Sequence, residues 1–178
     1  FFMVSGSLLL FGVVFNLYGR VKKIESDTKK IVKKIAIALL VVLVGMQFFR
    51  PDKNQAEGDY VAAFVAETQP SPEVQGILKS ACYDCHSANT NYPWYSNVAP
   101  ISYWLADHIE EGKEHLDFSD WANYTAKKKD HKLEELVEEV KEGEMPLNEY
   151  TWTHADARLT QEQITALLTW AEETRKKY

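Results

Sequence analysis

Two cysteines and a histidine lie within five residues, Cys82-Tyr83-Asp84-Cys85-His86, and the chain contains no other cysteine. Two thiols three positions apart lie on one helical turn, where each can form a thioether to one of the two vinyl groups of a porphyrin. The next residue can then offer its imidazole to the iron from the same side. The pattern predicts one covalent haem c, attached through Cys82 and Cys85, with His86 as an axial ligand.

Three other interpretations of these five residues are weaker. A structural zinc site needs four Cys or His ligands in two clusters, and the chain has no second cysteine pair. A thioredoxin-like redox pair lies in a β-α-β unit, and no strand alternation surrounds this motif. A simple disulfide between Cys82 and Cys85 would leave His86 without a role.

A haem held by His86 needs a second axial ligand, and Met145 is the candidate. It lies in residues 143–147 (GEMPL), after a predicted helix, and the following proline restricts its backbone to an extended conformation. A thioether is a soft ligand that favours ferrous iron and raises the redox potential. Met3 and Met46 lie in apolar N-terminal segments. The alternative is that Met145 simply fills a gap in the core.

Ligation by two histidines is the rival arrangement. His154, in the loop after Met145, is the strongest competitor. His108 lies on the apolar face of its predicted helix, where a hydrogen-bonded core histidine is the more usual interpretation. His115 and His131 lie among charged residues and are predicted to be exposed. An iron with one open face is the remaining option, and it would change the function.

Several large aromatic residues follow the motif, too many for a surface. We expect some of them to line the haem and exclude water, which also raises the potential, and others to pack in the ordinary core. Trp and Tyr donors, or Asn97, could bind the haem propionates. The aromatic residues are Trp94, Tyr95, Trp104, Trp121, Tyr150 and Trp152.

Helices must position these residues. Ser71 followed by Pro72 combines an N-cap with a proline in the first helical position, and the apolar stripe that follows leads into Cys82. Further helices are predicted over 60–67, 100–116 and from Asp130 to about residue 143, with a short turn capped by Ser119. Thr160 and Gln163 form a capping box for a last helix. No segment alternates as a strand does. We therefore predict an all-α, cytochrome c-like haem domain over residues 71–178.

The first fifty residues differ from the rest. Residues 1–18 and 35–49 are uncharged, and the second run reaches spanning length as 31–49 if the lysines at its start extend to the interface. Seven basic and two acidic residues lie between the two runs, in residues 19–34. The positive-inside rule places that loop in the cytoplasm, so the domain lies on the outer side of the bacterial inner membrane, in the periplasm.

We therefore predict a membrane anchor over residues 1–49, with one or two transmembrane helices (1–18 and 31–49), and a stalk over 50–70. Covalent haem attachment in bacteria takes place on the same outer side. A cleaved signal peptide is the alternative for 31–49, but no small-x-small cleavage site follows Val44. Because residue 1 is phenylalanine, residues 1–28 could be part of a fragment, or upstream sequence joined to a native start near Lys29.

Charge separates the same two parts of the chain. Of its 20 basic and 26 acidic residues, residues 1–50 hold 8 and 2, which leaves 12 basic and 24 acidic residues after Arg50. So acidic a domain argues against nucleic acid and against adhesion to anionic lipid. It suits a basic or dipolar redox partner protein attracted by its charge, although an acidic surface also serves solubility alone.

Longer segments around the motif carry a resemblance. Residues 81–87 (ACYDCHS) and 92–100 (YPWYSNVAP) resemble the bacterial haem-binding domain family, whose members look like relatives of monohaem cytochromes c. Residues 104–108, 118–121 and 143–147, with the helix 159–171, extend the match over roughly 70–174. The resemblance implies Cys82 and Cys85 as attaching residues, His86 as proximal ligand and Met145 as distal ligand. Many members look tethered by a segment like 29–49, and an apolar segment like 1–18 departs from that pattern.

These observations favour an electron-transfer protein and not an enzyme. The iron would cycle between ferrous and ferric while both axial positions stay filled, in a free carrier or in a subunit of a respiratory complex. A haem-based sensor or peroxide-handling protein, with an open or displaceable distal site, is the alternative. A structural haem subunit or an assembly factor is a third possibility.

Overall fold

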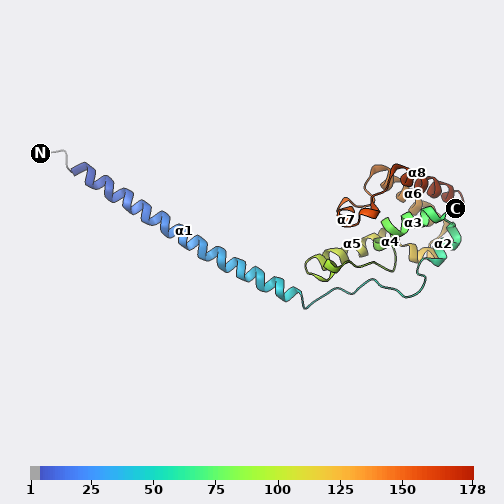
Figure 1. The fold of residues 1–178 in the computed structure, drawn as a ribbon, viewed down its shortest axis with the longest axis horizontal. Coiled ribbons are helices and arrows are strands. Elements are labelled where there is room, and N and C mark those ends of the chain that lie inside the picture. The colour runs from blue at the N-terminus through green and yellow to red at the C-terminus, as the bar shows by residue number, and fades with distance from the viewer. Residues whose placement is uncertain (1–4) are drawn as a thin grey trace. The chain divides into compact units, whose positions relative to one another are not determined.

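The computed structural model describes residues 5–178, and in its first helix it describes the side chains of residue 18, residue 20 and residues from 22 onwards. The chain divides into two units, Phe1–Phe49 and Arg50–Tyr178 (Figure 1). Within residues 5–178 the regular elements are all helical, and the one extended pairing is an isolated bridge between Gln55 and Asn89. The predicted all-α class is confirmed.

One continuous helix, α1 (Ser5–Met46), makes up the regular structure of the first unit. Residues 19–34, which we predicted as a loop between two helices, lie inside it, so that division of the chain was wrong. The segment contains no proline, and oppositely charged side chains one turn apart support the helix, as in the ion pair of 2.6 Å between Lys29 Nζ and Glu25 Oε1. A high density of charge does not by itself interrupt a helix.

The predicted transmembrane helices are not supported. Among the described residues, no helix combines the length and the apolar character that crossing a membrane requires. The side chains of residues 1–17, which are most of the first predicted spanning segment, lie outside the described residues.

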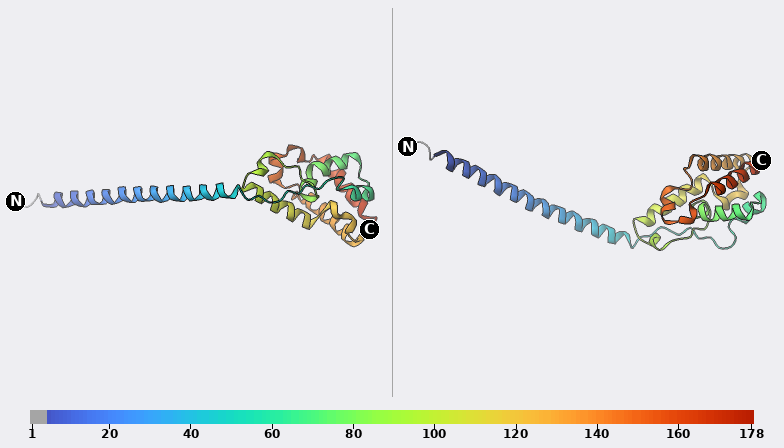
Figure 2. Two further views of the ribbon diagram at one scale, coloured as in Figure 1. Left: turned by 90° about the horizontal axis from the view of Figure 1, so that it is seen from below. Right: turned by 45° about the horizontal axis from the view of Figure 1, so that its top comes forward.

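The second unit is built from short helices around one core. The α-helices are α2 (Ala62–Thr68), α3 (Pro72–Ala81), α4 (Tyr83–His86), α5 (Ile101–His115), α6 (Ala126–Glu142), α7 (Asn148–Thr153) and α8 (Gln161–Arg175). Three 3₁₀ turns join them, η1 (Trp94–Asn97), η2 (Phe118–Asn123) and η3 (Ala155–Ala157). Helices α6 and α8 lie side by side, as Figure 1 and the right view of Figure 2 show.

Capping side chains explain where three of the seven α-helices of this unit start, α3, α6 and α8. The Ser71 hydroxyl caps α3 by accepting a hydrogen bond from the Val74 N–H, and Thr160 and Gln163 form the predicted capping box of α8. Two predicted starts were wrong. Helix α6 begins earlier than Asp130, because the Thr125 hydroxyl accepts the Lys128 N–H and caps it. Asp117, and not Ser119, caps η2.

Residues 50–70, which we predicted as a stalk, belong to the second unit and contribute to its core. The Phe64 ring of α2 is fully buried, and its centroid lies 4.7 Å from that of Phe118 and 5.1 Å from that of Trp121. The buried Lys129 Nζ of α6 lies 2.7 Å from a carboxylate oxygen of Glu67, which ties α2 to α6. Further upstream, the Asn54 side-chain amide donates to the Ser87 carbonyl at 2.7 Å.

Replacement of Phe64 tests whether this segment is part of the folded unit. We expect Phe64→Ala to lower the free energy of unfolding by about 3–5 kcal/mol, because it removes a ring from the centre of an aromatic cluster. Urea denaturation of the full chain measures this change. Trp94→Ala is the control, since the Trp94 side chain is 81% exposed and its loss should change stability by no more than about 0.5 kcal/mol. Equal stability of the two variants would mean that residues 50–70 are a linker.

Candidate cofactor site

The cysteine motif forms a single helical turn at the end of α3. Cys82 ends α3 and begins α4, and its carbonyl accepts the backbone N–H of Cys85 at 3.2 Å and of His86 at 3.0 Å. Both cysteines are free thiols. The turn holds the two thiols and the imidazole together, as the spacing predicted.

A mainly apolar pocket of about 440 Å3 opens beside this turn. It brings the three motif residues together with Met145, which lies beyond α5 and α6 in the chain. Its walls come from α4, α5, α6 and the segment that leads into α7. The lining residues are Cys82, Cys85, His86, His108, Glu111, Gly112, His115, Leu116, Phe118, Lys132, Glu135, Leu136, Glu139, Val140, Met145, Leu147 and Tyr150.

His86 is oriented by the end of α5. Its Nδ1 lies 3.0 Å from the carbonyl oxygen of Leu116, and because a carbonyl can only accept, this nitrogen carries the proton. Burial lowers the pKa of His86, against the opposing effect of hydrogen bonds to the carbonyls of Leu116 and Gly112. The neutral ring therefore keeps an unshared electron pair on Nε2, which is the form of histidine that binds iron.

Helices α4 and α5 pack closely at Gly112. A Cβ atom built on this glycine would lie 2.9 Å from the carbonyl oxygen of Cys85 and 3.3 Å from its Cβ. Any larger residue would therefore push α5 away from the motif. A glycine in a helix interior costs stability, and here the close approach of the two backbones is its reason. The sequence shows Gly112 as one ordinary residue of a charged helix, so we did not predict its role.

Met145 is positioned by the end of α6. Gly143 adopts φ 79°, a left-handed conformation that glycine tolerates best, and it ends the helix. The backbone N–H groups of Glu144 and Met145 then both donate to the Glu139 carbonyl, at 2.9 and 3.2 Å. The Met145 side chain is partly buried against the core and lines the pocket, so the predicted distal candidate lies in the same cavity as His86.

The four rival histidines divide into two groups. His108 and His115 line the pocket, whereas His131 and His154 do not. His131 is exposed beside Glu135, at 3.3 Å. The ring of His154, our strongest competitor to Met145, stacks on the Tyr150 ring with centroids 4.0 Å apart.

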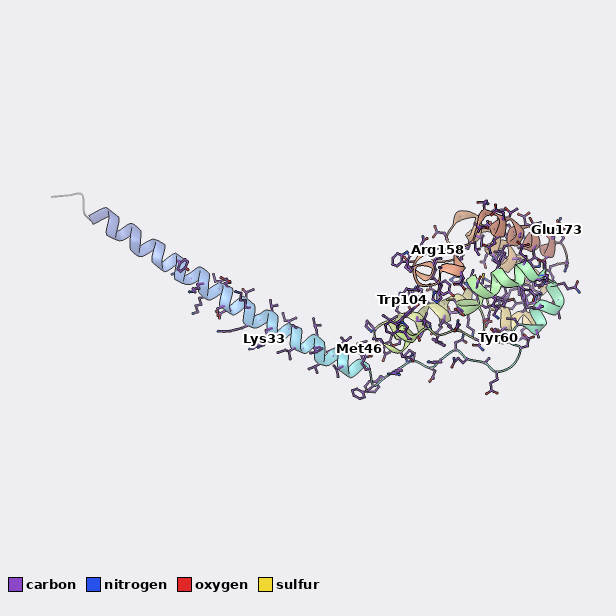
Figure 3. The ribbon with its side chains drawn as sticks, in the orientation of Figure 1. Lys33, Met46, Tyr60, Trp104, Arg158 and Glu173 are labelled. Atoms are coloured by element: carbon purple, nitrogen blue, oxygen red, sulfur yellow. The ribbon has the colours of Figure 1, made fainter. Side chains whose placement is uncertain are left out.

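The positions of the aromatic residues also differ from those that we predicted. Of the six we singled out, Tyr150 lines the pocket and Trp121 is fully buried in the core. Trp94, Trp152 and Trp104 are exposed, and Figure 3 shows Trp104 on α5 at the surface of the unit. The ring that lines the pocket in their place is Phe118, which the sequence analysis did not select. Asn97 does not line the pocket, and its side-chain amide donates to the Trp94 carbonyl.

A hydrogen bond that we did not predict joins the motif to α7. The Tyr150 hydroxyl donates to Asp84 Oδ2 at 2.8 Å, and Asp84 lies between the two cysteines. The other carboxylate oxygen, Oδ1, accepts the Asn91 N–H at 2.9 Å. Partial burial, and then the bond to Asp84, raises the pKa of Tyr150 above its ordinary value, so the phenol stays protonated and donates.

Both thiols are protonated at neutral pH. Burial raises the pKa of Cys82 to about 12, with Cys85 adding to the shift, and burial raises the pKa of Cys85 to about 11. Thiols of this kind react slowly with oxidants and with disulfides, because the thiolate is the reactive form. Charged side chains reach the pocket from α6 as well, where Lys132 Nζ lies 2.6 Å from Glu135 Oε2.

Substitution of Gly112 tests the contact between α4 and α5. We expect Gly112→Ala to lower the free energy of unfolding by about 1–3 kcal/mol, because the new methyl group meets a backbone oxygen that cannot move aside. Gly76→Ala is the matched control. Gly76 lies within α3 with no atom within 4 Å of its added Cβ, so the same change should raise stability by about 0.5–1 kcal/mol. Thermal or urea denaturation distinguishes the two, and a gain in both would contradict the close packing.

Comparison with known protein families gives a match that covers the site. The family model described as a haem-binding domain matches residues 41–173, which is well over half of the chain. No curated protein and no solved structure matches the chain significantly. The matched range covers the whole pocket, including the cysteine motif and Met145. The chain therefore belongs to the haem-binding domain family.

Proposed function

We propose that this protein is a monohaem c-type cytochrome that transfers electrons, with the haem attached through Cys82 and Cys85 and ligated by His86 and Met145. One observation carries the proposal. A single apolar pocket is lined by two thiols, an imidazole with its Nε2 electron pair free and a thioether from a distant part of the chain. These are the donor groups that attach a haem c and fill both axial positions of its iron.

The pocket residues fit that cofactor. A bound haem would supply a one-electron couple between ferrous and ferric iron. Each protonated thiol would add its sulfur and its hydrogen across one vinyl group, so attachment itself requires no oxidant. His86 is held in one tautomer and one orientation by Leu116, and the walls that would face the haem are mainly apolar and include Leu136 and Val140. A thioether ligand and mainly apolar surroundings both favour the ferrous state.

A haem-based sensor or peroxide-handling protein is the second candidate, and one observation favours it. His108 and His115 line the same pocket as Met145. The Nδ1 of His108 is held by the Trp104 carbonyl at 3.0 Å, so its Nε2 is free to accept a proton or to bind iron. If Met145 left the iron, either histidine could act as a base or as a replacement ligand.

The absorption spectrum of the matured protein tests the main proposal. We expect a covalent c-type haemochrome after denaturation, and in the native ferric protein the weak far-red band of methionine–iron ligation. Met145→Ala should remove that band and lower the reduction potential, because it removes the soft ligand. Met46→Ala is the control, since Met46 lies at the end of α1 and not in the pocket.

Two results would count against the electron carrier. A high-spin ferric spectrum, or rapid binding of carbon monoxide by the ferrous wild type at neutral pH, would mean that the distal position is open. The sensor or peroxide-handling protein would then be the better interpretation. Haem that extracts into acidified organic solvent would exclude covalent attachment.

The partners and location form a second part of the proposal. We propose that residues 31–49 attach the protein to the bacterial inner membrane, with the haem domain in the periplasm and a basic redox protein as its partner. Apolar side chains of this part of α1 are exposed, and Leu39, Val41 and Val42 are each 60–65% exposed. The excess of acidic residues after Arg50 supports a basic partner.

Fractionation of cells that make the full chain tests the attachment. We expect the protein in the membrane pellet, and Leu39→Glu combined with Val42→Glu should move it to the soluble fraction. Lys22→Glu is the control, because it changes the net charge by the same amount outside the apolar run. A wild-type chain that is soluble, or a double variant that stays in the pellet, would contradict attachment through these residues.

A further inference from the structure

We propose that Tyr150 and Asp84 form a latch that holds the segment with Met145 closed over the haem pocket. The inference rests on the proposed function, since it assigns a role in keeping Met145 at the iron. Tyr150 acts here as a positioning residue and not as a ligand.

The latch joins the part of the chain that contains the proposed ligand His86 to the part that contains the proposed ligand Met145. Asp84 lies within the motif that holds His86, and Tyr150 lies in the first turn of α7, just after Met145-Pro146-Leu147. The Tyr150 hydroxyl donates to Asp84 Oδ2 at 2.8 Å, and the Asn91 N–H donates to Asp84 Oδ1 at 2.9 Å. The carboxylate is therefore held from both sides, and its position in turn fixes the start of α7.

The ring of Tyr150 is itself held in place. It lines the pocket, and its other side stacks on the His154 ring at 4.0 Å with an interplanar angle of 10°. The Nδ1 of His154 bonds back to the Tyr150 carbonyl at 3.0 Å. His154 therefore supports Tyr150 and does not compete with Met145 for the iron.

Little else holds α7 to the domain. None of its residues is buried, in contrast to the other α-helices of this unit. Besides the Tyr150 bond, side chains from outside α7 hold it through the hydrogen bond of 2.8 Å between the Tyr95 hydroxyl and Thr153 and that of 3.0 Å from Arg158 Nε to the Thr151 carbonyl. A segment with so few buried contacts opens at low cost, so a bond to a carboxylate makes up a large share of what keeps it closed.

Opening of this segment would withdraw Met145 and expose the iron. An added ligand such as imidazole binds ferric iron only when Met145 has left, so its apparent affinity reports the open population. Loss of a hydrogen bond to a charged group is expected to raise that population about tenfold or more. The latch therefore predicts tighter imidazole binding without any change in the ligands themselves.

The experiment uses the matured full chain in the ferric state at pH 7 and follows loss of the methionine–iron band as imidazole is added. We expect Tyr150→Phe to bind imidazole about tenfold more tightly than the wild type. Tyr178→Phe is the matched control, because it also removes a tyrosine hydroxyl that donates to a carboxylate, Glu67 Oε1 at 2.7 Å, and neither of these residues lines the pocket. It should leave imidazole affinity within twofold.

A double-mutant cycle separates the latch from a general loosening. Asp84→Ala and Tyr150→Phe should have effects that do not add, because each removes the same bond. Equal imidazole affinity of Tyr150→Phe and wild type, or strictly additive effects, would overturn the latch while the methionine band stays present. Absence of that band in the wild type would instead overturn the proposed function.

Discussion

The packing of α4 against the end of α5 is the constraint on which the rest of the site depends. The motif turn can approach α5 because Gly112 has no side chain at the contact. A Cβ atom there would lie only 2.9 Å from the carbonyl oxygen of Cys85. That approach brings the Leu116 carbonyl within 3.0 Å of His86 Nδ1. The missing methyl group thus allows the contact that fixes the orientation and the tautomer of the histidine, on which the proposed ligation of iron depends.

The segment that brings Met145 to the pocket is held much less firmly. Met145 follows a helix end at Gly143 and precedes α7, which buries none of its residues. The distal side therefore depends on a few polar contacts, of which the Asp84–Tyr150 bond reaches the motif itself. A firmly held His86 and a lightly held segment with Met145 are compatible with the proposed electron carrier. They also explain why a displaceable ligand at Met145 is the reasonable alternative.

The size of the folded unit also follows from tertiary contacts. Residues 50–70 contain Pro51 and Pro70 and many polar residues, and their composition alone resembles a linker. Phe64 nevertheless supplies the ring at the centre of the core, next to Phe118 and Trp121. One buried aromatic residue per short helix is too sparse a signal to reveal this role, because its partners come from elsewhere in the chain.

Local features could be predicted from the order of the residues alone. The motif Cys82-Tyr83-Asp84-Cys85-His86, the caps at Ser71 and Thr160 and the all-α class could all be predicted, because each depends on residues within one or two helical turns. Two features depend on the tertiary structure. Met145 reaches the same pocket as His86, and His154 stacks on Tyr150 and does not line that pocket. The same holds for Gly112, which one-dimensional periodicity cannot distinguish from any other residue of a charged helix. The physical reason is that pocket walls are contacts between distant segments, and these depend on how helices pack and not on what each helix contains.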